Sequence, residues 1–72
     1  MTSANQRRQI LMEVDAWFAE RGFGMVLSKD KDGYWADLFS KQSLEVTIPR
    51  YGRGTTPEEA AESARTRYRT EE

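Results

Sequence analysis

The chain of 72 residues contains neither cysteine nor histidine. Without cysteine it forms no disulfide, thiolate metal site or cysteine nucleophile, a composition that suits an intracellular protein. Without histidine it lacks the commonest general base and the commonest metal ligand. These absences disfavour catalysis, and we expect a protein with no catalytic residues, no bound metal and no cofactor.

Long apolar runs and an excess of charge are also missing. No segment approaches the ~18 consecutive apolar residues that a membrane-spanning helix requires, and the N-terminus lacks the apolar stretch of a signal peptide. The formal net charge is only −1, which argues against strong nonspecific binding to nucleic acid. The sequence therefore predicts a cytoplasmic protein that does not bind a membrane.

Length and composition predict one small domain that spans residues 1–72, with frayed ends at about 1–3 and 70–72. Hydrophobic residues make up 38% of the chain and charged residues 32%, which leaves a small core. A chain of this size buries only ~60% of the surface that it exposes when unfolded. Its two Trp, three Tyr and three Phe residues therefore supply much of the buried area.

The N-terminal part predicts a helix over residues 4–21. Ser3 and Gln6 have the spacing of a capping box at its start. Gly22 stands where glycine commonly ends a helix in the left-handed conformation. Apolar residues recur three and four positions apart and form one stripe, which consists of Ile10, Leu11, Val14, Trp17 and Phe18.

Three strands are expected, at residues 23–28, 34–40 and 44–48. The Asp32–Gly33 pair lies between the first two and predicts a hairpin turn. The third segment alternates apolar and polar residues, which directs Leu44, Val46 and Ile48 inward. Pro49 ends or flanks this strand, because proline has no N–H to donate to a neighbouring strand.

The C-terminal part predicts a second helix with a marked start. Thr56 is its expected N-cap, Pro57 its first residue and Glu59 the partner of Thr56 in a capping box. Gly52 and Gly54 precede it and could hold a phosphate on backbone N–H groups, but a structural turn is favoured. The inward stripe of the helix consists of Ala60, Ala61, Ala64 and Tyr68.

These elements together predict an α+β fold of order α-β-β-β-α. Its three strands form an antiparallel sheet, and both helices pack on one face of that sheet.

The second strand carries large aromatic residues on both of its faces. Tyr34, Ala36 and Leu38 share one face, and a sheet covered on one side alternates apolar and polar residues. Asp37 marks the opposite face as the open one. The open face is then expected to carry the partner-binding residues Trp35, Phe39, Val26 and Thr47. The alternative is that these rings only pack across neighbouring strands.

Arginines are concentrated in the last third of the chain. Four of them are candidates for contact with phosphate or with an acidic protein, namely Arg50, Arg53, Arg65 and Arg69. The alternative, which we favour, is a solvated helix end whose arginines complement the helix dipole.

Two segments resemble the HicB-type antitoxin domain. They are Asp32-Gly-Tyr-Trp35, at the start of a strand, and Gly52-Arg-Gly-Thr-Thr-Pro-Glu-Glu-Ala-Ala61, at the start of a helix. The resemblance covers about half of the chain. It implies a domain that binds and masks a small RNA-cleaving toxin.

The order of elements is also similar to that of the double-stranded RNA-binding domain. That family has a glycine-rich entry to an alanine-faced second helix, whose first residues are lysines that grip phosphates. Here Glu58 and Glu59 stand at those positions and oppose an RNA backbone.

The sequence therefore predicts a non-enzymatic protein-interaction module, similar to a HicB-like antitoxin or to a small phage or accessory regulator. It would bind a protein partner, or form a homodimer, through the open sheet face. The alternative is a nucleic-acid-binding domain of the double-stranded RNA-binding type.

Overall fold

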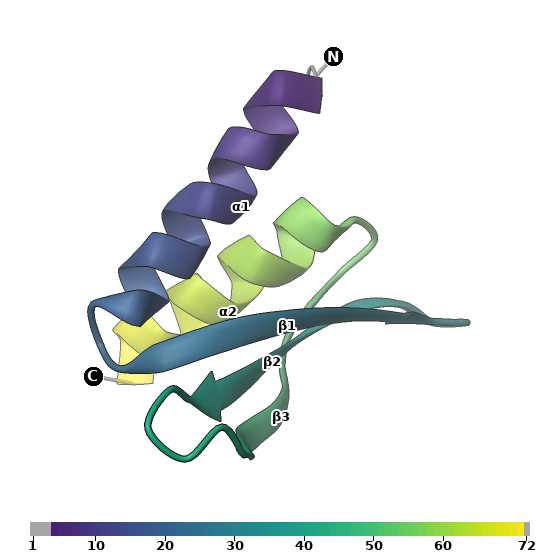
Figure 1. Ribbon diagram of the computed structural model, residues 1–72. Helices are drawn as coiled ribbons and strands as arrows, with labels where there is room; N and C mark the ends of the chain where they lie inside the picture. Colours follow the sequence, from purple (N-terminus) through teal and green to yellow (C-terminus); the bar gives the residue numbers. More distant parts are fainter. Residues whose placement is uncertain (1–3, 72) are drawn as a thin grey trace.

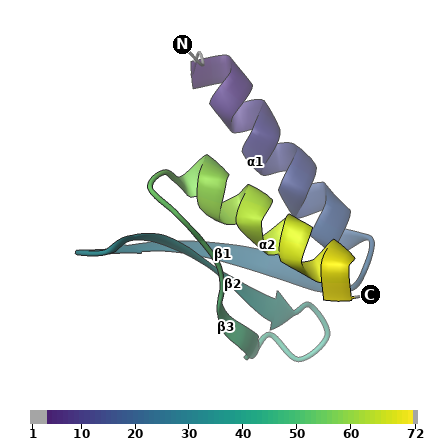
Figure 2. The same ribbon diagram turned by 180° about the vertical axis from the view of Figure 1, so that it is seen from behind.

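The predicted order of elements and the α+β class are confirmed by a computed structural model, which describes residues 4–71 apart from the side chain of Val46. The antiparallel sheet has the strand order β1-β2-β3. Both helices lie on the same side of this sheet, and its other face is uncovered (Figures 1 and 2). The elements are α1 (Ala4–Ala19), β1 (Phe23–Asp30), β2 (Gly33–Ser40), β3 (Val46–Gly54) and α2 (Pro57–Glu71).

Helix α1 buries the stripe that the sequence predicts. Val14 and Phe18 are fully buried, and Ile10, Leu11 and Trp17 pack beside them. The helix ends at Ala19, two residues earlier than expected, and Gly22 follows with the expected positive φ of 85°. The expected capping box at Ser3 lies outside the described residues.

The core lies between the helices and the inner face of the sheet. Aromatic rings meet there edge to face, with the Phe18 and Tyr68 ring centroids 5.7 Å apart and those of Trp17 and Tyr68 5.5 Å apart. The buried hydrophobic residues are Val14, Phe18, Ala36, Leu38, Tyr51, Ala60, Ala61 and Ala64.

Strand β3 differs from the prediction at both of its ends. Leu44 was expected to begin the strand and point inward, but it lies in the preceding turn with φ of 62° and is 76% exposed. Pro49 does not end the strand. The pairs Leu38↔Ile48 and Ala36↔Gly52 leave residues 49–51 opposite a single residue of β2, so the missing proline N–H falls in a bulge where no ladder bond is needed.

The glycines before α2 belong to β3 and do not form the expected turn. Gly52 pairs with Ala36 and Gly54 with Tyr34. A Cβ atom on Gly52 would lie 2.2 Å from the carbonyl oxygen of Ala60, a residue of α2. Glycine is therefore required because the helix backbone lies directly against the strand.

The start of α2 is capped much as predicted. The Glu59 N–H donates to the Thr56 hydroxyl over 3.1 Å. The Glu59 carboxylate accepts hydrogen bonds from the N–H and hydroxyl of Thr55 at 2.8 and 2.6 Å, one residue before the usual partner. These two groups hold the pKa of Glu59 below its ordinary value.

The two ends of the described chain are both helical. Thr70 and Glu71, which we expected to fray, lie in the last turn of α2. None of the helices within residues 4–71 has the length and apolar character needed to cross a membrane.

Candidate functional site

The open sheet face carries three of the four residues that were predicted to bind a partner, namely Val26, Trp35 and Phe39. Ala36 and Leu38 are buried beneath the helices, so the alternation of β2 directs Trp35 and Phe39 to the opposite face. Val26 pairs with Asp37 and therefore shares this face; its side chain is 46% exposed. Thr47 is exposed on β3 and lies at a register shift, between the pairs Leu38↔Ile48 and Phe39↔Val46.

Trp35 is held in a fixed orientation near the tip of the β1–β2 hairpin, which extends beyond both helices (Figure 1). Its indole N–H donates to Oδ2 of Asp30 over 2.8 Å. The other oxygen of Asp30 accepts the N–H of Asp32 at 2.8 Å, which fixes the carboxylate within the turn. The ring is therefore oriented before any partner arrives.

Two arginines from β3 lie against the same ring. The guanidinium carbon of Arg50 is 4.7 Å from the ring centroid of Trp35, and that of Arg53 is 5.4 Å away. Arg50 also approaches Oδ2 of Asp30 at 3.6 Å. We refer to Asp30, Trp35, Arg50 and Arg53 as the Trp35 cluster.

The pKa of Asp30 lies below its ordinary value because its charged form gains several partners. The N–H of Asp32 has the largest effect, and the Trp35 indole and the Arg50 guanidinium add to it. Asp30 is therefore ionised at neutral pH and balances the charge of Arg50. Within residues 4–71 no carboxylate forms an ion pair with Arg53, so the cluster carries one unbalanced positive charge.

The bulge in β3 places Arg50 over the ring. Arg50 adopts a left-handed conformation with φ of 50°, and its N–H donates to Oδ1 of Asp37 over 2.7 Å. Asp37, on the neighbouring strand β2, therefore stabilises the bulge in β3. The sequence marks Asp37 as an open-face residue but does not reveal this contact, because neither the bulge nor the cross-strand pairing has a local signature.

Phe39 has a structural partner on the same face. It pairs with Gly24, and a Cβ atom on Gly24 would lie 2.1 Å from its ring. The ring therefore covers the glycine of the neighbouring strand. Phe39 therefore packs across strands on β1, as the alternative interpretation expects, and the Trp35 ring packs against Arg50 and Arg53 of β3.

The four arginines of the nucleic-acid hypothesis are divided between two places. Arg50 and Arg53 belong to the Trp35 cluster on the open face. Arg65 and Arg69 lie on α2, which covers the opposite face, and Arg65 is paired with Glu62 over 2.6 Å. They do not form one basic patch.

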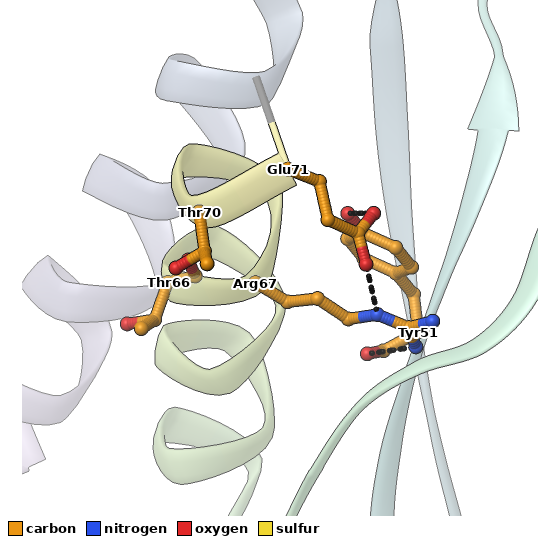
Figure 3. Close-up of polar contacts among 5 residues, drawn as sticks. All are labelled: Tyr51, Thr66, Arg67, Thr70 and Glu71. Carbon is orange, nitrogen blue, oxygen red and sulfur yellow. Dashed lines mark hydrogen bonds and ion pairs between the residues drawn. The ribbon is translucent and has the colours of Figure 1, made fainter.

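A second polar cluster ties the end of α2 to β3 (Figure 3). The Tyr51 hydroxyl donates to Glu71 over 2.9 Å, and Glu71 also accepts from Nε of Arg67 at 2.9 Å. Arg67 lies over the Tyr51 ring, 4.5 Å from its centroid. Burial, followed by the nearby Glu71 carboxylate, raises the pKa of Tyr51 to about 12.

Tyr51 gives the structure a testable response to alkaline pH. Its pKa is raised above the unfolded value of 10.0, so its contribution to stability is complete below pH 10 and is lost as pH rises through about 12. We expect near-ultraviolet tyrosinate absorbance to show one late step near pH 12 that is absent from Tyr51→Phe. A late step that persists in this variant would assign it to another tyrosine.

Among the described residues, no three acidic side chains lie close enough together to hold a metal ion. A depression between α1 and the start of α2 is lined by Arg7, Ile10, Thr56, Glu58, Glu59 and Glu62, and includes none of the predicted site residues. The candidate site is the open face, where Trp35 is held by Asp30, Arg50 and Arg53.

Comparison of the chain with protein-family models, curated proteins and solved structures found no match.

Proposed function

We propose that the protein is a non-enzymatic interaction module that binds a protein partner through its open sheet face. The observation that supports this proposal is the Trp35 cluster. A large aromatic ring lies on the face that no helix covers, and its orientation is fixed by Asp30 and two arginines. Tryptophan and arginine are the residue types that most often dominate the binding energy of protein interfaces.

The fixed ring favours binding for an energetic reason. A side chain that becomes immobilised in an interface costs ~0.5–1.5 kcal/mol of conformational entropy. The hydrogen bond from Trp35 to Asp30 imposes that order in the free protein. Trp35 therefore offers its apolar area to a partner with little further loss of freedom.

The chemistry of the face specifies the complementary surface. Trp35 and the exposed Val26 require an apolar contact, whereas Arg53, which has no ion-pair partner among the described residues, favours a carboxylate. We expect the partner to present an apolar patch bordered by an acidic side chain. The HicB-type resemblance would make this partner a small RNA-cleaving toxin.

The decisive experiment compares Trp35→Ala with the wild-type protein. The partner is first captured from the native host with the wild-type chain, identified and purified. Trp35→Ala should then weaken its binding by roughly 30-fold or more, the scale of a central interface residue. Because no helix packs on Trp35, the circular dichroism spectrum of this variant should remain that of a folded protein.

The matched control is Leu44→Ala, which removes a more exposed apolar side chain from the turn before β3. It should leave the affinity unchanged. Equal affinities for wild type and Trp35→Ala would overturn the proposal.

The nucleic-acid alternative is tested by the same proteins with duplex RNA at low salt. We expect no binding to duplex RNA, because the four arginines lie on two different faces and Glu58 and Glu59 repel phosphates at the start of α2. Binding that weakens steeply with added salt and is lost in an Arg50→Ala, Arg53→Ala variant would replace the protein partner with RNA.

A further inference from the structure

The two edges of the sheet differ in their capacity to pair with another strand. At the β3 edge the backbone is interrupted by Pro49, the bulge and the positive φ of Arg50. Such features block the addition of a further strand. Strand β1 has none of them, since its eight residues pair with β2 in one continuous register. Figure 1 shows β1 as the nearest strand, with no other element in front of its outer edge.

The register identifies the backbone groups that point outward from β1. The two-residue turn places Asp30 opposite Gly33 as the closing, hydrogen-bonded pair. At the other end of the hairpin, the Lys41 N–H donates to the Gly22 carbonyl over 3.1 Å. Gly22 is eight residues before Asp30, so both belong to the same alternating set of residues that bond to β2. Every second residue therefore bonds to β2, and the residues between them direct N–H and C=O groups to the free edge, namely Phe23, Met25, Leu27 and Lys29.

We propose that this edge pairs with the β1 strand of a second copy of the chain, antiparallel, to form a continuous six-stranded sheet. The outward groups are symmetric about Val26. In the pairing that uses all of them, Met25 lies opposite Leu27 and Phe23 opposite Lys29 of the second copy. Val26 lies opposite Val26, and Gly24 opposite Ser28.

This arrangement is self-complementary in charge and apolar surface. It brings no two like charges opposite each other, because Lys29 faces a phenylalanine. It also covers Val26, which is 46% exposed and lies at the centre of the strand. In antiparallel pairs such non-hydrogen-bonded positions bring the side chains closest together.

The symmetric pairing is independent of partner binding through the Trp35 cluster. A two-fold axis perpendicular to the sheet keeps both open faces on one side, so the dimer would present two Trp35 clusters in one direction. Trp35→Ala should leave the dimer intact. Because Val26 belongs to both surfaces, Trp35→Ala is the variant that separates them: it should lose the partner and keep the dimer.

Opposite charges at position 26 provide the test. Light scattering coupled to size exclusion should show a concentration-dependent dimer for the wild type. Val26→Lys and Val26→Glu should each weaken dimerisation by roughly tenfold or more, because each places like charges face to face. An equimolar mixture of the two variants should restore the dimer, since lysine then faces glutamate.

Leu44→Lys is the matched control, because it makes the same apolar-to-lysine change outside β1 and should leave the dimer unchanged. A wild-type protein that stays monomeric at ~1 mM, or a mixture of variants that stays monomeric, would overturn the proposal. Hydrogen exchange on the wild type gives a second measurement that needs no variant. The amides of Met25 and Leu27 should become protected as concentration rises; protection that does not depend on concentration would contradict the pairing.

Discussion

Gly52→Val is expected to unfold the protein. A Cβ atom at this position would lie 2.2 Å from the Ala60 carbonyl oxygen and 2.6 Å from the Ala64 backbone nitrogen. Both neighbours are backbone atoms of α2, so no side chain can rotate away and the helix must separate from β3. Overpacking usually costs ~1–3 kcal/mol and more where the backbone must move. A domain of this size has only ~3–5 kcal/mol to lose.

Urea denaturation followed by circular dichroism measures this effect, with Gly52→Ala as the milder change. Gly22→Ala is the control, because Gly22 has no atom near its Cβ position but adopts a φ of 85°. It should cost only ~1–2 kcal/mol, the conformational penalty alone. If Gly52→Ala were less destabilising than Gly22→Ala, the close contact between β3 and α2 would not limit stability.

Local signals in the sequence predict the elements whose geometry is set locally. The Thr56 cap, the Asp32–Gly33 hairpin and the alanine stripe each occur as expected, because capping and turn formation involve residues within a few positions of one another. The inner face of β2 is also predicted correctly. Ala36 and Leu38 are fully buried on the face that the helices cover, and the Asp37 between them marks the other face.

The largest difference from the prediction concerns β3, where distant contacts override the local pattern. Leu44, Val46 and Ile48 alternate as an ideal strand, yet Leu44 remains in a turn at 76% exposure. The strand is shifted toward the C-terminus because Gly52 and Gly54 must lie beneath α2, a requirement that only the folded helix creates. The bulge accommodates residues 49–51, which lie opposite a single residue of β2.

The same bulge explains why the candidate site was predicted only in part. Trp35 could be placed on the open face from alternation alone. Arg50 was assigned to a separate basic cluster, since its contact with the Trp35 ring depends on a positive φ and on the Asp37 hydrogen bond. Trp35 and Arg50, which the sequence assigns to two different candidate surfaces, therefore belong to one cluster in the structure.

Phe18→Ala is expected to have an effect comparable with that of Gly52→Val, by creating a cavity. Phe18 is the largest fully buried side chain and its ring contacts Trp17 and Tyr68 edge to face, at centroid distances of 5.1 and 5.7 Å. Replacement of a buried phenylalanine by alanine typically costs ~3–5 kcal/mol. This equals the whole stability of a domain of this size, so the variant should be largely unfolded at 25 °C.

Phe39→Ala makes the same chemical change on the open face and separates the two sides of the sheet. Its ring is partly exposed and covers Gly24, so its loss should cost less than ~2 kcal/mol and leave the protein folded. Comparison of the two free energies of unfolding then tests the one-sided architecture directly. If the helices cover only one face, Phe18→Ala should lower the free energy of unfolding much more than Phe39→Ala does. Equal penalties would mean that the face carrying Trp35 is also part of the stabilising core, and that it is not free to bind a partner.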